Sequence, residues 1–383
     1  MTTLKSKKKF NLKPYLTYMV LALAMIILVP MSEAGKLTFS DYIQLENAAI
    51  AMVLSASLCL VVGFLGELSL GHAGFMCVGA FIGGRLSVAL TEMNLFGGSE
   101  LGIMLICMLV GGICAAICGV IIGLPALRLR GDYLAIVTLA FGEIVRSLIR
   151  NAPAELFGGT LSLATPRYDR DHMFIISFIM VIVTVFVLQN LLRSKHGRAI
   201  TAIRDSEIAA RATGINVTKY KLLVFTVSAF FAGIAGVLFS YSNYTLDSAK
   251  FNYNYSIQIL VMVVLGGMGS MGGSLVAATA ITLLDSFLQK ELTGDLAVLK
   301  NLLYALILIL LIVYRNAPAL KNFREKWSLK TLMAKFRKTD PSKVADDEAK
   351  WDRVPTKIMV DEVLSVDVQV NSPYTPDKAK KED

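Results

Sequence analysis

Long apolar runs alternate with short polar segments over most of this chain. Helices and closed barrels alone satisfy every backbone polar group inside a bilayer, and a helix needs about 20 apolar residues to cross one. The pattern therefore predicts an all-α polytopic membrane protein with about 8–10 transmembrane helices, some of them half-spans. The predicted apolar crossings are residues 15–31, 48–65, 75–90, 101–123, 133–149, 173–192, 222–241, 257–265, 275–288 and 298–314.

Composition supports a membrane protein and removes several other classes. Of 383 residues, 55% are hydrophobic and 17% are charged, values that a soluble domain of this length does not reach. The net charge of +9 does not indicate nucleic-acid binding, because the lysines and arginines gather in loops between apolar runs. The five cysteines lie in or beside apolar runs without a Cys-x-x-Cys pair, which is typical of packing residues.

A basic loop at residues 193–221 is the longest polar interruption between two apolar runs. It carries seven cations against Asp205 and Glu207, and a short loop this basic is predicted to face the cytoplasm. Residues 199–213 are predicted to form a short helix that ends at Gly214. Such a helix, with small side chains and no core of its own, fits a groove on a separate soluble subunit. The alternative is an ordinary cytoplasmic loop.

The charge distribution also predicts where the termini lie. Five lysines lie in an N-terminal basic segment, residues 1–14, and eight cations lie between residues 315 and 338. Both ends are therefore expected in the cytoplasm, flanking a permease domain at residues 15–314. Residues 315–383 are basic and then acidic, with several prolines, which predicts a disordered tail. The first apolar run could instead be a secretory signal core, but its length and the spans after it favour a retained helix.

Two glycine-rich breaks interrupt the apolar pattern at matching places. Residues 66–71 and 267–272 both read Gly-x-x-Ser-apolar-Gly, and each lies between two apolar runs. Glycine lets the backbone leave helical geometry, and paired breaks predict broken helices in an internal repeat, with a site near the bilayer midplane. The helices after the breaks are expected to offer N–H groups to an anion such as a carboxylate. The residues predicted to line the translocation pathway are Gly66, Ser69, Gly71, His72, Gly267, Ser270 and Gly272.

Each of these polar features has a plainer explanation. Glycines often mediate close helix packing in membranes, and a histidine inside a helix bundle is usually satisfied by its neighbours. Glu143, Arg146 and Arg150 follow helical spacings of three and four residues, which is typical of a paired polar face near the end of a helix. We expect that face to be structural rather than a transport site.

Motifs for catalysis are missing from the sequence. It has no phosphate loop, no cluster of metal ligands and no nucleophile motif, and its three histidines are far apart. We therefore expect neither an enzyme nor a bound cofactor or metal. Energy for active transport would have to come from another chain or from an ion gradient. An ion-coupled carrier needs a buried charged relay, and Glu67 is the acid that lies near a break.

Several stretches, in order along the chain, resemble one family. They are GELSLGHAGFMCVGAF, LRLRGDYLAIVTLAFGEIVR, GRAITAIRDSEIAARATGINVTKYKLLVFTVSAFFAGIAGVLF and VLGGMGSMGGSLVAA. Together they are similar to the LivM-type permease subunit of bacterial branched-chain amino-acid ABC importers, over roughly residues 45–318. The resemblance implies a permease that translocates leucine, isoleucine and valine across the cytoplasmic (inner) membrane, with ATP hydrolysed by partner subunits.

The resemblance also implies that the basic loop couples the permease to an ATPase. ABC importers carry Glu-Ala-Ala, three residues and then Gly at this place. Ala209, Ala210 and Gly214 fit that spacing. Ile208 occupies the glutamate position, with Glu207 one residue earlier. The residues predicted to couple to the ATPase are Arg204, Glu207, Ala209, Ala210 and Gly214.

The implied partners are a second, homologous permease chain, two ATP-binding cassette subunits, an extracytoplasmic solute-binding protein, the amino-acid solute and membrane lipid. Relatives of the family are associated with urea, short amides and other amino acids, so these solutes stay open as alternatives. A self-contained ion-coupled carrier or channel is the rival class, and it predicts transport without partner chains.

Overall fold

The computed structural model describes residues 38–93, 100–126, 129, 131–159, 162–166, 170–243 and 245–291, together with residues 30, 305, 306 and 309. The predicted N-terminal basic segment, nearly all of the first and last predicted crossings, and the predicted tail lie outside these residues.

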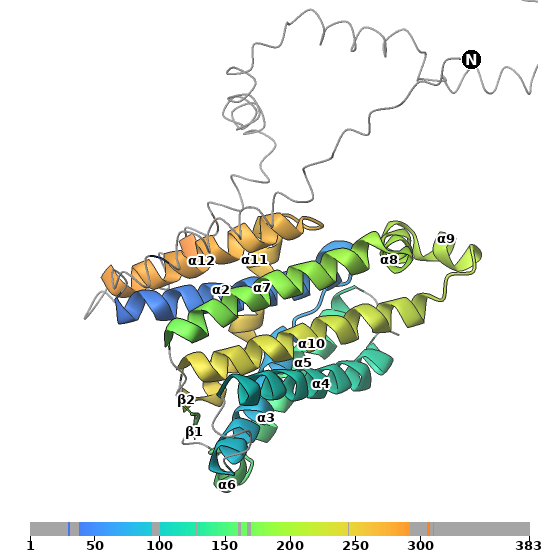
Figure 1. The fold of residues 1–383 in the computed structure, drawn as a ribbon. Helices are drawn as coiled ribbons and strands as arrows, with labels where there is room; N and C mark the ends of the chain where they lie inside the picture. The colour runs from blue at the N-terminus through green and yellow to red at the C-terminus, as the bar shows by residue number, and fades with distance from the viewer. Residues whose placement is uncertain are drawn as a thin grey trace, which may run out of the picture. The chain divides into compact units, whose positions relative to one another are not determined.

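Apolar helices make up most of the described chain, as the hydrophobic pattern predicts (Figure 1). Among the described residues, six helices are long and apolar enough to cross a membrane. Two more of the predicted runs lie in α5 (Asp132–Arg150), which carries more charge, and in the shorter α11 (Tyr253–Gly266). The all-α membrane fold is thus confirmed. The six helices are α2 with its extension η1 (Phe39–Cys59 and Leu60–Leu65), α3 (His72–Glu92), α4 (Glu100–Ala126), α7 (Arg170–Arg193), α10 (Val217–Asn243) and α12 (Met271–Glu291).

Short elements connect these helices. Helix α6 (Ala154–Phe157) and strand β1 (Leu163–Ala164) follow α5, and strand β2 (Thr245–Leu246) and the 3-10 helix η3 (Ser248–Phe251) follow α10. The two strands pair antiparallel, with Leu163 opposite Leu246. The basic loop forms α8 (Lys195–Asp205) and α9 (Glu207–Ala212), which lie at the opposite end of the helices from the two strands (Figure 1).

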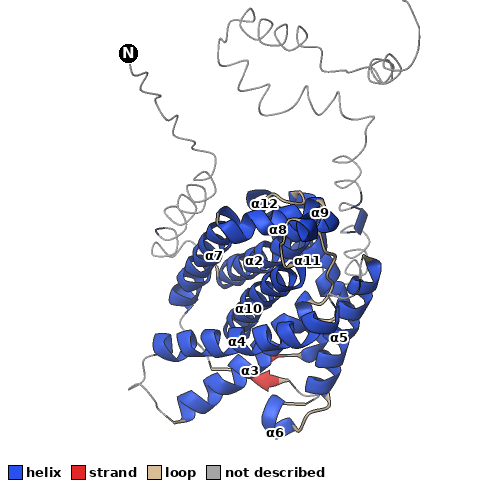
Figure 2. Cartoon of the chain, turned by 90° about the vertical axis from the view of Figure 1, so that its right-hand side faces the viewer, coloured by secondary structure: helices blue, strands red, loops and turns tan. Residues whose placement is uncertain are grey.

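Helix α10 lies in the centre of the bundle, where it contacts α2, α3 and α4 (Figure 2). Glycines permit this packing, because a side chain would not fit between the backbones. A Cβ on Gly79 of α3 would lie 2.2 Å from the carbonyl oxygen of Gly233, and one on Gly236 would lie 2.1 Å from that of Met76. Small residues that allow such close approach are typical of helix contacts in membranes.

The predicted single helix at residues 199–213 is wrong, because the structure has two helices there. Ser206 lies between α8 and α9 in an extended conformation, with φ −159° and ψ 110°. Its hydroxyl accepts the N–H of Ala209 at 3.3 Å and caps the start of α9. The predicted helix stop is correct, since Gly214 follows α9 with φ +84°, a left-handed conformation that ends helices.

Helix α2 begins earlier than its apolar run. The helix starts at Phe39, whereas the predicted crossing starts at Ala48. The extra turns include Glu46, which is buried and whose Oε2 accepts the Ser242 hydroxyl at 2.5 Å. Because a buried carboxyl needs such partners, its place in a helix depends on a distant residue and does not follow from local hydropathy.

Candidate functional site

The first break begins where α2 changes its helical geometry. Its extension η1 is a π-helix, and Gly66 ends it in a left-handed conformation with φ +82°. The N–H of Glu67 returns to the Val61 oxygen at 3.2 Å. The chain then runs without helix until α3 starts at His72. π-Helical turns are frequent at functional sites, so this break is a candidate for one.

The second break separates α11 from α12. Gly267 and Gly269 have positive φ values of +102° and +84°. The Ser270 hydroxyl accepts the N–H of Gly273 at 3.2 Å at the start of α12, and Gly272 lies in the first turn of that helix. Each of the two breaks therefore turns the chain through a glycine with positive φ.

Arg204 of α8 contacts both breaks. Its Nη1 donates to the carbonyl oxygen of Gly63, in η1, at 3.1 Å. A Cβ on Gly66 would lie 2.8 Å from Arg204 Cγ, and one on Gly269 would lie 3.4 Å from Arg204 Nη1. The breaks also meet each other, since a Cβ on Gly63 would lie 2.6 Å from the Gly269 nitrogen. We call these four residues the loop–break junction.

Ion pairs connect the first break to α9. Lys221, near the start of α10, is 4% exposed, and its Nζ lies 2.5 Å from Glu67 Oε1 and 3.3 Å from Glu207 Oε2. Glu207 also pairs with Arg211, whose Nη2 lies 2.6 Å from Glu207 Oε1. A lysine this buried needs these partners, because an uncompensated buried charge is strongly destabilising.

The predicted coupling residues divide into two groups. Arg204 and Glu207 contact the first break or the ion pairs beside it. Ala210 is buried against the bundle, whereas Ala209 and Gly214 are exposed. Ile208, at the position where ABC importers carry glutamate, is 80% exposed. Helix α9 therefore presents the apolar side chain of Ile208 and the small side chain of Ala209 to the outside.

Neighbouring helices close off the start of α3. His72 is 1% exposed, and its Nε2 lies 3.0 Å from the Ser228 hydroxyl, which donates to the Ser57 oxygen at 2.6 Å. The N–H of Ala73 donates to the Ser256 hydroxyl at 3.1 Å, and the next two N–H groups return to the backbone of the break. For these three N–H groups of α3, the expectation that the helix after a break offers its N–H groups to an anion is therefore wrong.

The end of the first break packs against α5. A Cβ on Gly71 would lie 2.8 Å from the Thr138 oxygen, and the Thr138 hydroxyl accepts the N–H of Leu70 at 3.0 Å. Ser69 is fully buried. Of the predicted pathway residues, Gly66 thus lies at the loop–break junction, whereas Ser69, Gly71 and His72 lie deeper in helix contacts. Close packing accounts for the glycine at position 71.

The polar face of α5 is paired, as a structural role requires. Arg146 Nη2 lies 2.6 Å from Glu143 Oε2. Glu143 Oε1 accepts the N–H of Tyr253 at 2.9 Å. Glu143 therefore holds the start of α11 against α5.

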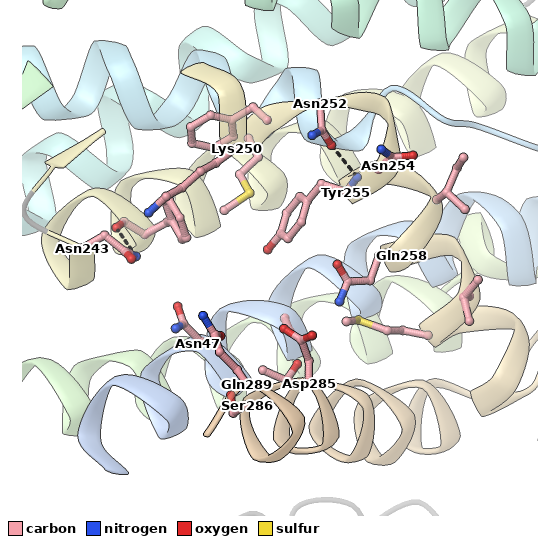
Figure 3. Close-up of a pocket in the computed structure, with 18 of the residues that line it drawn as sticks. Asn47, Asn243, Lys250, Asn252, Asn254, Tyr255, Gln258, Asp285, Ser286 and Gln289 are labelled. Atoms are coloured by element: carbon pink, nitrogen blue, oxygen red, sulfur yellow. Dashed lines mark hydrogen bonds between the residues drawn. The ribbon is translucent and has the colours of Figure 1, made fainter. Parts of the chain in front are cut away.

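A polar cavity whose lining includes no residue of either break was not predicted from the sequence. It has a volume of about 720 Å³ and is lined by α2, α3, α10, η3, α11 and α12 (Figure 3). One available signal was the spacing of polar residues by three and four positions in α12, as at Thr282, Asp285 and Gln289. The charged and amide residues in the lining are Asn47, Asn243, Lys250, Asn252, Asn254, Gln258, Asp285 and Gln289.

Sequence relatives identify the family of the chain. A family model described as "Branched-chain amino acid transport system / permease component" matches residues 44–313. The chain belongs to this family. The matched range contains both breaks, the basic loop and every residue of the polar cavity except Ile43. The resemblance predicted from the sequence is thus confirmed, and the permease is a multi-pass membrane protein.

Two curated relatives of the permease are 34% identical to it. The high-affinity branched-chain amino acid transport system permease protein LivM of Salmonella typhimurium aligns over 317 residues, which cover 75% of this chain and 71% of that protein. LivM of Escherichia coli aligns over 318 residues with the same shares of 75% and 71%. A probable LivM of Methanocaldococcus jannaschii is 28% identical over 245 residues, covering 61% of this chain and 70% of that protein. No solved structure gives a significant match.

Proposed function

We propose that this permease moves branched-chain amino acids across the bacterial cytoplasmic membrane, with ATP hydrolysed by partner subunits. The family description and the names of the two LivM relatives support the solute. The partners are a second, homologous permease chain, two ATP-binding cassette subunits and an extracytoplasmic solute-binding protein. Urea, short amides and other amino acids are the alternative solutes for the same architecture.

The contact of Arg204 with both breaks carries the mechanism. Its hydrogen bond to Gly63 links α8 directly to the π-helix that leads into the first break. The positive φ values of Gly66 and Gly269 mark backbone that can change direction without a steric penalty from a side chain. A movement of the basic loop would therefore reach both breaks through one side chain, as a two-state coupling element requires.

Helix α9 is the proposed docking site for the ATPase. Its exposed Ile208 and Ala209 suit a groove of the kind that receives a short helix. With isoleucine in the glutamate position, the contact is apolar at its centre. The cations of the basic loop support a cytoplasmic position for this docking surface, and the basic terminal segments support the same position for both termini.

An ion-coupled carrier is the second candidate class. It requires an acid that takes up and releases an ion, and Glu67 lies beside the first break. The Glu67 carboxylate is already engaged in an ion pair with the buried ammonium of Lys221 at 2.5 Å. This pairing favours the ATP-driven class. Purification separates the two, since ATPase subunits in stoichiometric amounts support the first and a homo-oligomer without partners supports the second.

Replacement of Arg204 tests the coupling. Arg204→Met removes the hydrogen bond to Gly63 but keeps an apolar stem of similar reach. In the reconstituted complex we expect leucine uptake to fall about tenfold or more, as the loss of a charge-assisted hydrogen bond implies. The ATPase subunits should stay bound, while ATP hydrolysis loses its stimulation by solute.

Arg198→Met is the matched control, because Arg198 is an exposed arginine of the same helix. We expect it to transport leucine at the normal rate. Normal uptake by Arg204→Met, or the same loss in both variants, would remove Arg204 from the coupling mechanism.

A further inference from the structure

The polar cavity lies toward the opposite end of α2 from the loop–break junction. Ile43, Asn47 and Ala51 line it on successive turns of α2, from near its start to just past its middle. The junction is formed after the last turn of the same helix, at Gly63 and Gly66. Ala51, the lining residue of α2 nearest to the junction, precedes Gly63 by twelve residues, which is about 18 Å along the helix at roughly 1.5 Å for each residue.

The two sides of the cavity carry opposite charge. Lys250 of η3 lies on one side, beside the start of α11, where the Asn252 side chain caps the N–H of Tyr255 at 3.0 Å. Asp285 of α12 lies on the facing side (Figure 3). A ligand with one anionic and one cationic group matches this arrangement.

Amide side chains surround the two charges. Asn47 and Gln289 lie on the side of Asp285, Asn254 lies on the side of Lys250, and Gln258 lies between the two sides (Figure 3). Each amide offers both donors and an acceptor, so the same set can bind a carboxylate or an ammonium group. Ligand sites commonly combine a few such convergent polar groups with an apolar wall, in volumes of about 300–1,000 Å³.

The deep part of the cavity is apolar. Lys250, Asn254 and Gln289 are exposed at its mouth, whereas Met76 and Met262 are buried. Ala51, Val261 and Met262 follow the polar residues of α2 and α11 by one helical turn and add to the apolar part of the lining. Methionine side chains adapt to apolar ligands of different shape.

We propose that this cavity binds a free aliphatic α-amino acid as a zwitterion. The ligand carboxylate lies against Lys250, its ammonium group lies against Asp285, and its side chain lies on the apolar floor. The inference that the ligand has an aliphatic side chain rests on the proposed function. The inference that it is a zwitterion rests on the charges that line the cavity and does not depend on that function. The permease therefore carries a solute site of its own, in addition to that of its binding protein.

Binding of labelled leucine to the assembled complex tests this site. The complex is placed in lipid nanodiscs without nucleotide or binding protein, and three competitors are compared: leucine, isopentylamine and 4-methylpentanoate. The two analogues each lack one charged group of the zwitterion. Unlabelled leucine should compete at least about tenfold better than either analogue, because each analogue lacks one charged group and the hydrogen bonds that this group makes in the cavity.

Charge variants should separate the two ends of the ligand. Lys250→Met should weaken leucine binding about tenfold while leaving isopentylamine binding unchanged, because the amine has no carboxylate to lose. Asp285→Asn should also weaken leucine binding about tenfold, but it should leave the binding of 4-methylpentanoate unchanged, because that acid has no ammonium group to lose. Retained binding of one analogue shows that each variant is folded. Lys290→Met and Glu291→Gln are matched controls on α12, exposed and outside the lining, and should bind leucine normally.

A cysteine at Gln258 locates the ligand. Leucine should slow modification of Gln258→Cys by a polar thiol reagent, whereas the unsubstituted complex gives the background from the native cysteines. Three results would overturn the proposal: no protection by leucine, displacement by lipid headgroups instead of leucine, or equal weakening of all three probes in both variants. If cells take up leucine while the complex fails to bind it, the cavity assignment falls and the proposed function stands. If the complex binds leucine but cells do not transport it, the proposed function falls and the cavity assignment stands.

Discussion

Gly214 illustrates how one residue can be required for its backbone alone. Its φ is +84°, and a Cβ at this position would meet nothing within 4 Å. Space is therefore no obstacle to a larger residue, but the left-handed conformation is, at about 1–2 kcal/mol for an ordinary L-residue. The turn after α9 depends on that conformation, and so does the shape of the proposed docking surface.

Substitution at Gly214 should affect transport according to backbone preference. Gly214→Val, which is β-branched, should disturb the turn and reduce leucine uptake severely while membrane insertion stays intact. Gly214→Asn is the matched control, because asparagine tolerates the left-handed region, and it should keep most of the uptake. Uptake assays with quantification of the protein in the membrane make the comparison. Equal uptake by the two variants would show that the turn plays no part in coupling.

At the scale of elements, Lys221 joins the first break, α9 and α10. Its ammonium group lies between the carboxylates of Glu67 and Glu207. Glu67 is 14% exposed and Lys221 is 4% exposed, so the pair is largely withdrawn from water. Loss of one partner from such a pair is worse than loss of both, because the remaining charge is left without compensation.

This asymmetry predicts the order of stability of two variants. Lys221→Met should destabilise the permease by about 3–5 kcal/mol, the usual effect of leaving a buried charge unpaired. The double variant Glu67→Gln with Lys221→Met should recover part of that loss, since Glu207 keeps its pairing with Arg211. Thermal unfolding in detergent measures both. A double variant less stable than the single one would mean that the pair contributes by another route.

The hydrophobic pattern predicts which segments form helices, but it predicts the first and last residues of those helices less well. Long apolar runs define a membrane helix by length alone, so the described helices follow the predicted runs. The interruption at Ser206 did not follow from residues 199–213, because alanine and isoleucine around it are compatible with helix and the serine acts as a cap. The start of α2 was missed because Glu46 is satisfied by Ser242, a partner far away in the sequence.

The site was predictable in its local parts only. Matched glycine motifs indicated both breaks, and the family pattern indicated Gly214. The spacing of residues along the sequence does not predict the contact of Arg204 with Gly63 or that of Lys221 with Glu67. Such contacts depend on how helices that are distant in the sequence pack together. Each of several elements contributes one or a few residues to the lining of the polar cavity. No single stretch of the sequence therefore predicts the cavity.

At the scale of the whole molecule, the polar cavity and the loop–break junction lie toward opposite ends of α2. The proposed docking surface for the ATPase is α9, next to the loop–break junction, and the proposed solute site is the polar cavity. Helix α2 spans both, from Asn47 in the cavity to the π-helix that Arg204 contacts. We propose that transport is a change at the breaks that is driven from the basic loop and opens a path for the amino acid.

Uptake of labelled leucine by cells with and without this chain tests the central claim most directly. Isoleucine, valine, urea and a nucleoside serve as competitors. The account predicts that uptake falls when the chain is deleted, returns when it is restored, and is inhibited by isoleucine and valine alone. Leucine uptake that is untouched by deletion, or equal inhibition by urea or the nucleoside, would contradict the assignment of a branched-chain amino-acid permease.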